Sequence, residues 1–280
     1  MRRISTIAEM KVACRQVTRS GKTLGFVPTM GALHEGHLSL VRASKARCHI
    51  TAVSIFVNPL QFGPTEDLDN YPRTLQRDAS LLEQLGVDLL FVPSVSEMYP
   101  AGAETYVLVD DLSNKLDGAS RPGHFRGVAT VVAKLFEIIR PDCAFFGQKD
   151  AAQVAVLRKM VTDLDMDVEI VVCPIVREKD GLAMSSRNGY LTPKQRQQAL
   201  VLYRALMRVQ LTADRGERDA RKLREIGKDM IAEEPGARLD YFEIVDPGTL
   251  EPVADLSRGA LVAVAAYFGT TRLIDNIMLT

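Results

Sequence analysis

The sequence has no tryptophan, few cysteines and no excess of charge of either sign. Its four cysteines, Cys14, Cys48, Cys143 and Cys173, are scattered without C-x-x-C spacing. This scatter argues against a disulfide framework and against a cysteine-based zinc site. It predicts buried thiols in a reducing compartment, so we expect a cytoplasmic protein.

The balance of charge limits the partners. Lysine plus arginine and aspartate plus glutamate both total 35. A general nucleic-acid surface or an acidic-lipid patch needs a basic excess, so neither is expected. The longest apolar run, Ala260–Phe268, is far shorter than the roughly 20 residues that span a bilayer, so no membrane segment is expected. Any anionic ligand must therefore be held by local groups.

Several catalytic motifs are also missing. No G-x-G-x-x-G follows the first predicted strand, and G-x-x-x-x-G-K-[ST] does not occur. These absences weaken a dinucleotide oxidoreductase and a P-loop kinase as interpretations. No G-x-S-x-G elbow and no catalytic-cysteine context is present either.

The hydrophobic pattern predicts strands that alternate with helices. Strands are expected over 22–27, 49–57, 88–92, 143–146 and 168–172, with helices over 6–19, 37–47, near 75–85, over 126–139 and after 150. This alternation indicates an α/β fold with a Rossmann-like, doubly wound parallel sheet. The residue pattern changes after Val176. We expect helices over 193–211 and 219–233 and strands over 241–245 and 260–268. We therefore predict a nucleotide-binding domain over 1–177 and a smaller α+β lid domain over 178–280.

One stretch, Phe26–Ser39, combines a strand, a glycine-containing turn and two histidines. Pro28 cannot donate to a sheet ladder and is expected to end the strand. A helix beginning near Gly36 would aim its free N–H groups at an anion, with His34 and His37 on one side of its first turn. A satisfied core histidine beside a surface histidine is the plainer alternative. Zinc is a weaker one, because it needs three or four ligands.

Later segments repeat this anion-binding logic. Gly147–Asp150 joins a strand to a helix and carries Lys149, while residues 183–189, A-M-S-S-R-N-G, carry two serines and Arg187. The loop around Gln61 and the segment Arg121–Gly127, with two arginines and His124, are further candidates. Taken singly, each of them also fits an ordinary turn or surface loop.

The order of these motifs resembles the nucleotidyltransferase superfamily. Within it, six blocks resemble the pantothenate synthetase family: P-T-M-G-A-L-H-E-G-H, S-I-F-V-N-P-L-Q-F, Y-P-R-T, S-R-P-G-H-F-R-G-V-A-T-V-V, F-F-G-Q-K-D and S-S-R-N-G-Y-L-T. The likeness extends to L-I-D-N near the C-terminus. It implies an ATP-dependent ligase that condenses pantoate with β-alanine through a pantoyl adenylate, releasing AMP and diphosphate. It also implies Mg²⁺ and a homodimer.

The resemblance also assigns residues. ATP would be bound by Met30, Gly31, Ala32, Leu33, His34, Glu35, Gly36, His37, Gly147, Gln148, Lys149, Asp150, Val176, Met184, Ser185, Ser186 and Arg187. Among these, His37, His34, Lys149, Ser185 and Arg187 would be catalytic. Gln61 would bind pantoate and β-alanine, Gln153 would bind pantoate, and Asp78 is the candidate for Mg²⁺. Adenylation builds negative charge on phosphorus, which donors of this kind stabilise.

Two other classes of protein remain as alternatives. A different nucleotidyltransferase without amide formation would lack Y-P-R-T and R-P-G-H-F-R-G, which are both present. A regulatory nucleotide-binding module would have a broken H-x-G-H or M-S-S-R, and both are intact. tRNA charging would need an anticodon-binding extension and a basic surface, and neither is evident.

Overall fold

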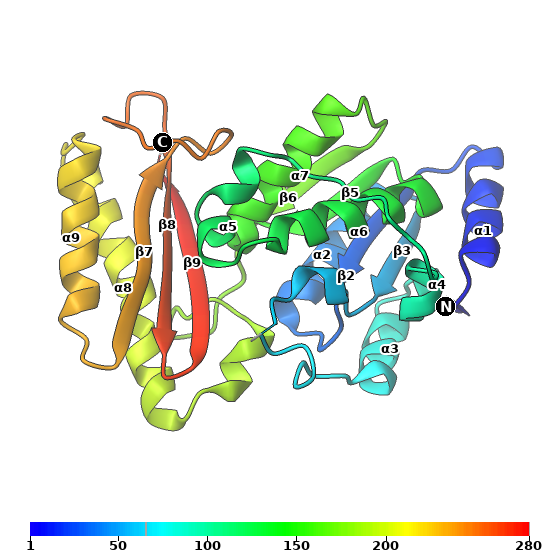
Figure 1. Cartoon of the computed structure of the whole chain (residues 1–280), viewed down its shortest axis with the longest axis horizontal. Coiled ribbons are helices and arrows are strands. Elements are labelled where there is room, and N and C mark those ends of the chain that lie inside the picture. Colours follow the sequence, from blue (N-terminus) through cyan, green and yellow to red (C-terminus); the bar gives the residue numbers. More distant parts are fainter. Residues whose placement is uncertain (65, 280) are drawn as a thin grey trace.

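The computed structural model describes residues 1–64 and 66–279; residue 65 of the expected loop and residue 280 of the expected second domain lie outside the described residues. A parallel sheet with the order β1-β4-β3-β2-β5-β6 forms the larger part (Figure 1). Its strands are β1 (Arg2–Ile4), β2 (Leu24–Thr29), β3 (Ile50–Ile55), β4 (Leu89–Phe91), β5 (Cys143–Gly147) and β6 (Glu169–Cys173). The Rossmann-like prediction is confirmed.

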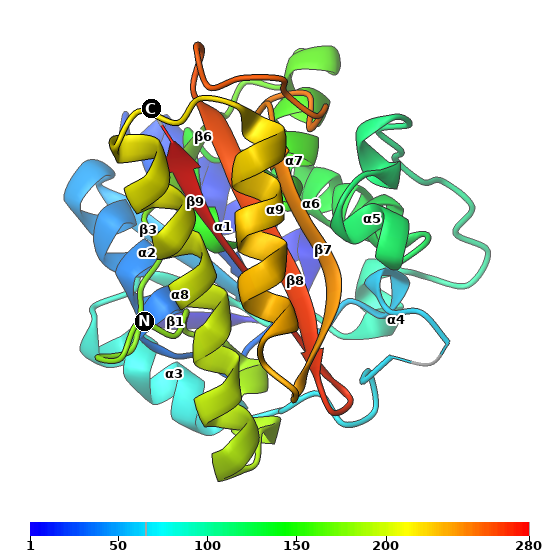
Figure 2. The same cartoon turned by 90° about the vertical axis from the view of Figure 1, so that its left-hand side faces the viewer.

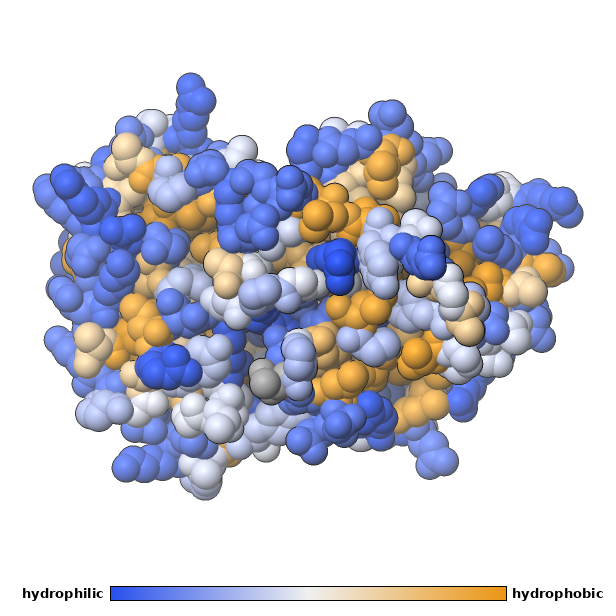
Figure 3. Space-filling view, in the orientation of Figure 1, coloured by the Kyte–Doolittle hydropathy of each residue, from blue (hydrophilic) through white to orange (hydrophobic). Residues whose placement is uncertain are grey.

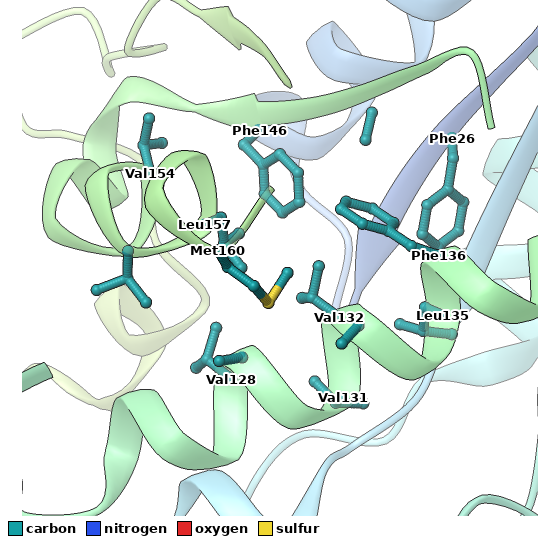
Figure 4. Close-up of a cluster of buried hydrophobic side chains, with 14 of the residues drawn as sticks. Phe26, Val128, Val131, Val132, Leu135, Phe136, Phe146, Val154, Leu157 and Met160 are labelled. Carbon is teal, nitrogen blue, oxygen red and sulfur yellow. The ribbon is translucent and has the colours of Figure 1, made fainter. Parts of the chain in front are cut away.

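Helices cover both faces of this sheet because alternate strand residues point to opposite sides. Phe26 belongs to the apolar cluster beneath α1 (Ile7–Arg19), α6 (His124–Ile139) and α7 (Ala151–Asp163). Val27, the next residue, belongs to the cluster beneath α2 (Glu35–Arg47) and α3 (Leu75–Gln84). Figure 4 shows α6 and α7 directing side chains such as Val132 and Leu157 toward Phe146 of β5.

Pro28 does not end its strand, contrary to the prediction. β2 continues to Thr29, and Pro28 is paired with Ser54 of β3. On the other side, the pairing of β2 with β5 ends at Phe26 and Ala144. The last part of β2 therefore has a strand on one side only, which is the setting in which a sheet tolerates proline.

The C-terminal part contains a three-stranded antiparallel sheet, β7 (Ala237–Val245), β8 (Ala260–Phe268) and β9 (Thr271–Leu279). Figure 2 shows α8 (Pro193–Asp214) and α9 (Ala220–Ala232) lying across one face of it. These two helices and the sheet share an apolar cluster of their own. The predicted smaller α+β unit is confirmed as an architecture.

Two strands are missing from the sequence-based prediction. β1 has three residues, of which only Ile4 is buried, so it has no readable period. β9 carries Asp275 and Asn276 in its middle, and both side chains are buried. Two polar residues interrupt the apolar alternation that marks a strand. The short helices α4 (Val95–Met98) and α5 (Asp117–Ser120) were not predicted either.

The strand order fixes where a ligand can bind. β2 lies between β3 and β5, so the chain leaves β2 and β5 toward opposite faces. In open α/β sheets the crevice lies at the carboxyl ends of strands flanking such a switch point. The H-x-G-H stretch follows β2 and G-Q-K-D follows β5. In the part of the chain that the structure describes, no helix has the length and apolar character to cross a bilayer.

Candidate active site

Two histidines form the first turn of α2. His34 is the N-cap, and its Nδ1 accepts the backbone N–H of Gly36 at 3.1 Å. The Nδ1 of His37 accepts the N–H of His34 at 3.4 Å, and the two ring centroids are 4.2 Å apart. A Cβ on Gly36 would lie 2.9 Å from the ring of His34, so the glycine is needed for this approach. The prediction that both rings share this turn is confirmed.

These contacts set the protonation of both rings. Because each Nδ1 is an acceptor, the neutral imidazole carries its proton on Nε2. Burial, reinforced by Lys149, lowers the pKa of His34 to about 4. Burial and the adjacent His34 lower the pKa of His37 to about 3. Both rings are therefore neutral near pH 7, and each has one Nε2–H to donate.

Asp78, which the resemblance assigns to Mg²⁺, holds the turn ahead of α2 in this structure. The side chain is completely buried, and its two oxygens accept the N–H groups of Ala32 at 2.8 Å and Leu33 at 3.0 Å. Thr74 donates its hydroxyl to the same carboxylate at 3.1 Å. Asp78 therefore shapes the turn ahead of α2, in which Gly31 and Ala32 have positive φ, and it lines none of the three cavities described below.

The turn after β5 presents Lys149. A short 3₁₀ helix, Gln148–Asp150, connects β5 to α7, and the ammonium of Lys149 lies 3.6 Å from Asp150. The backbone carbonyls of Gln148 and Lys149 both accept from the side chain of Asn276 on β9. Two segments more than a hundred residues apart thus meet at this turn.

The serine loop, residues 183–189, is the third segment of the site. Ser185 is the N-cap of the 3₁₀ helix Ser186–Tyr190 and accepts the N–H of Arg187 at 3.2 Å. The guanidinium of Arg187 binds Asp67 in a fork, with distances of 3.2 Å from Nε and 2.9 Å from Nη2. Burial alone would lower the pKa of Arg187, but the bonds to Asp67 raise it. Two of its donor groups are therefore already occupied, which the sequence does not reveal.

These three segments enclose a cavity of ≈ 160 Å³, which we call the nucleotide compartment. Of the predicted ATP-binding residues it is lined by Met30, His34, Gly36, His37, Gly147, Lys149, Asp150, Val176, Met184, Ser185, Ser186 and Arg187. The remaining five do not line it. Gly31, Ala32 and Leu33 form the turn held by Asp78, Glu35 pairs with Arg42 on the surface, and Gln148 donates to Asn276.

A second cavity of ≈ 200 Å³ adjoins the first, and we call it the inner compartment. Gln61 and Gln153 both line it, together with Val128, Val131 and Val132 of α6. It shares His37, Asp150 and Arg187, among others, with the nucleotide compartment. A pocket that combines a valine-lined wall with amides and charged side chains suits a small branched, polar-ended molecule.

Gln61 is held in place by Asn58, which the sequence did not single out, and by His124, which it did. Its side-chain oxygen accepts from the buried Asn58 at 3.1 Å, and Asn58 accepts the hydroxyl of Tyr99 at 2.9 Å. The backbone carbonyl of Gln61 accepts from Nδ1 of His124 at 2.8 Å. Burial, and then Arg121, lowers the pKa of His124 to about 4, so this ring is neutral too.

One of the two arginines in the segment Arg121–Gly127 lines the site. Arg121 lines the inner compartment and binds Glu66 through Nε and Nη2. Arg126 lies instead over the ring of Tyr106, at 4.7 Å from its centroid, and lines neither the inner nor the nucleotide compartment. A third and wider cavity of ≈ 640 Å³, the outer compartment, continues from Glu66 and Asp67 toward Arg272 of β9. The molecule is hollowed between its two parts (Figure 3).

Comparison with known proteins decides the family. A profile described as Pantoate-beta-alanine ligase matches residues 2–278. The chain belongs to the pantoate–β-alanine ligase family. A pantothenate synthetase from Koribacter versatilis is 64% identical over 279 residues, covering 100% of this chain and 96% of that protein. As a member of the pantoate–β-alanine ligases, the chain is an enzyme of pantothenate synthesis.

Solved structures of the family agree with this fold. Pantothenate synthetase from Thermus thermophilus superposes with a TM-score of 0.94 at 49% identity, covering 99% of both chains. Pantoate-β-alanine ligase from Francisella tularensis, solved in complex with beta-gamma ATP and β-alanine, gives 0.81 at 34% identity, covering 99% of this chain and 97% of that one. The ligase family was also the prediction from the sequence motifs.

Proposed function

We propose that this ligase joins pantoate to β-alanine in two steps at the adjoining nucleotide and inner compartments. A carboxylate oxygen of pantoate attacks the α-phosphorus of ATP, and diphosphate leaves. The β-alanine amine then attacks the acyl carbon of the pantoyl adenylate, loses a proton, and AMP leaves with the oxygen that pantoate contributed. Negative charge builds up on the phosphorus and on the departing diphosphate. The reaction therefore needs hydrogen-bond donors at the phosphate more than it needs a nucleophile on the protein.

The two histidines carry this proposal. Their Nδ1 atoms are occupied by backbone N–H groups, so the Nε2–H groups are the donors available to phosphate oxygens. The helix dipole adds partial positive charge at the N-terminal end of α2. Neutral rings avoid the cost of two buried imidazolium ions at 4.2 Å. His34 and His37 thus act as preorganised donors, with no change of protonation near pH 7.

Cationic groups face them across the nucleotide compartment. Lys149 supplies a point charge, and Ser185 and Ser186 supply hydroxyls. Arg187 lines all three compartments, and part of its guanidinium binds Asp67. An entering phosphate therefore competes with Asp67 for that fork. Val176 lines the same compartment, and its backbone would meet the adenine ring.

The inner compartment suits pantoate. Its valine-lined wall fits the branched carbon skeleton, and the amides of Gln61 and Gln153 fit its hydroxyl and carboxylate oxygens. Gln61 would also face β-alanine, which the Francisella tularensis relative holds in its solved complex. The acyl phosphate formed between the compartments then lies beside His37, which lines both.

Mg²⁺ would enter with the nucleotide. Among the described residues, no group of three His, Cys, Asp or Glu side chains could hold a metal ion by itself. Mg²⁺ is commonly held by one or two carboxylates plus substrate phosphates, and Asp150 is the carboxylate that lines the nucleotide compartment beside Lys149. The ion would neutralise charge on the phosphates.

We further propose that the chain divides into two domains, 1–177 and 178–280, and that the second domain acts as a lid. We also propose a cytoplasmic location and a homodimer. The four free cysteines support a reducing compartment. The exposed side chains of Leu108 and Leu164 line one shallow cavity and supply apolar surface for self-association. Sedimentation of the purified chain as a single monomeric species would contradict the dimer.

An isotope experiment tests the reaction. Pantoate labelled with ¹⁸O in its carboxylate is incubated with ATP, Mg²⁺ and β-alanine, and the released nucleotide is analysed by mass spectrometry. Attack at the α-phosphorus predicts one ¹⁸O in AMP and none in diphosphate. Label in inorganic phosphate, with ADP as the nucleotide product, would overturn the proposal.

A further inference from the structure

Two buried polar residues on β9 take no part in the chemistry described above. Asp275 is 3% exposed and Asn276 is 2% exposed, although β9 is the edge strand of its sheet. Figure 1 shows that this edge faces the parallel-sheet part of the molecule. Burying two adjacent polar side chains is costly unless each finds partners, so their contacts indicate what they do.

Asn276 binds the turn that carries Lys149. Its Nδ2 donates to the backbone carbonyls of Gln148 and Lys149, both at 2.9 Å. Its Oδ1 accepts from the side chain of Gln148 at 3.1 Å. Both donor hydrogens and the acceptor of the amide are thus used on one two-residue segment. A side chain with this pattern fixes the path of that backbone and hence the origin of the Lys149 side chain.

Asp275 binds the segment that leads to the serine loop. Its oxygens accept from Nη1 and Nη2 of Arg177 at 2.6 Å and 2.9 Å. The side chain of Arg177 also donates to the carbonyl of Gly181 at 3.0 Å, and its backbone forms an antiparallel β-bridge with that of Ala183. The hairpin closed in this way delivers Met184, the first residue of the loop that lines the nucleotide compartment.

We propose that Asn276 and Asp275 are positioning residues for the nucleotide site, Asn276 acting through Lys149 and Asp275 through the Arg177 hairpin. The inference rests on the proposed function, in which Lys149 and the serine loop act on ATP. It adds that strand β9 of the C-terminal part holds the two phosphate-facing segments in register. Docking of that part on the parallel-sheet part and assembly of the phosphate site are therefore one event.

The chain offers a matched pair of substitutions. Asn276→Asp keeps the size of the side chain but replaces two donors with an acceptor that faces two carbonyls. Asn114→Asp makes the same chemical change at an exposed position, where Nδ2 donates to the carbonyl of Asp110 at 2.7 Å, outside the three compartments. Thermal unfolding of both variants establishes that they are folded at the assay temperature.

Pantoate-dependent exchange of labelled diphosphate into ATP is then measured in two backgrounds. We expect Asn276→Asp to lower kcat/KM for ATP by at least about tenfold, the loss of two hydrogen bonds of ordinary strength, and Asn114→Asp to change it less than about twofold. In a Lys149→Gln background, Asn276→Asp should have less than about a twofold further effect, because the group it positions is gone. An equal loss in both backgrounds, or none in either, would overturn the proposal.

A second readout does not depend on activity. Amide hydrogen exchange of a peptide covering 147–150 should become at least about tenfold faster in Asn276→Asp and remain unchanged in Asn114→Asp. Unchanged protection of that peptide would also overturn the proposal. If the unsubstituted enzyme showed no diphosphate exchange while this peptide lost protection, the positioning role would stand and the adenylation proposal would fail.

Discussion

The imidazoles of His34 and His37 lie with their centroids 4.2 Å apart and their planes at 43°, each accepting a backbone N–H at Nδ1. This relationship turns two titratable side chains into neutral donors. It arises locally, because His34 is the N-cap of α2 and His37 is one turn further on. The reciprocal bonds leave both Nε2–H groups for the ligand.

The first prediction concerns the protonation of these rings. Because burial lowers the pKa of His34 to about 4 and of His37 to about 3, their ring carbon NMR signals should stay constant from pH 8 to pH 5.5. Assignment uses the variants His34→Gln and His37→Gln. A midpoint near pH 6.5 for either ring would show that it is protonated like a free histidine.

The same pKa values predict a loss of stability in acid. An unfolded histidine titrates near 6.5, so between that pH and the folded pKa the unfolded chain binds more protons. The contribution of the two neutral rings to the free energy of unfolding is therefore fully present above pH 6.5 and is lost as the pH falls toward 4. Urea unfolding should show a fall of up to about 1.4 kcal/mol per pH unit for each buried ring, and His37→Gln should reduce that slope. The same slope in the variant would contradict this account.

The second prediction separates a structural carboxylate from a metal ligand. Asp78→Asn leaves one buried N–H of Ala32 or Leu33 facing an amide group in place of an acceptor. We expect the free energy of unfolding to fall by about 1–3 kcal/mol. The Mg²⁺ concentration for half-maximal activity should not change. A large shift in that concentration with unaltered stability would identify Asp78 as a metal ligand.

The third prediction uses a close approach of backbones. A Cβ on Gly127 would lie 2.2 Å from the carbonyl oxygen of Leu60 and 2.6 Å from the backbone N of Gln61. Gly127→Ala should therefore displace Gln61 and raise the KM for pantoate by at least about tenfold, or about 1.4 kcal/mol. Gly248→Ala, where the added Cβ makes an ordinary contact at 3.4 Å, is the control. An unchanged KM in Gly127→Ala would remove Gln61 from the pantoate site.

The fourth prediction concerns the fork of Arg187. Lysine keeps the charge but cannot bind Asp67 or a phosphate through two parallel N–H groups. Arg187→Lys should lower kcat/KM for ATP by at least about tenfold, equivalent to about 1.4 kcal/mol. Arg126→Lys, at the arginine stacked on Tyr106, should leave it within about twofold. Equal rates for Arg187→Lys and the unsubstituted enzyme would limit Arg187 to a structural ion pair.

Local sequence was enough to predict where three segments of the candidate site lie. The H-x-G-H turn, Gly147–Asp150 and the serine loop each follow a strand and carry their own turn residues, so their positions are readable from the chain. The strand–helix alternation likewise predicted the parallel sheet, because buried strands are continuous apolar runs. The C-terminal sheet was only partly predicted, since β9 breaks that pattern at Asp275 and Asn276.

The rest depended on contacts between distant residues. Asp78 follows Y-P-R-T, and nothing near it in the sequence indicates a partner for its carboxylate. In the structure that carboxylate accepts hydrogen bonds from N–H groups 45 and 46 residues away. Asp67 and Arg187 are 120 residues apart, and Asn276 reaches a turn 127 and 128 residues away. No local period or motif encodes such pairs. They become visible only when both segments have been placed.

The fifth prediction tests adenylation itself, the central claim. The purified enzyme is incubated with ATP, Mg²⁺, pantoate and labelled diphosphate, without β-alanine, and label in ATP is counted. A reversible pantoyl adenylate predicts exchange that requires pantoate and that saturates with it. No exchange above a pantoate-free control, in enzyme that makes pantothenate when β-alanine is added, would contradict the account.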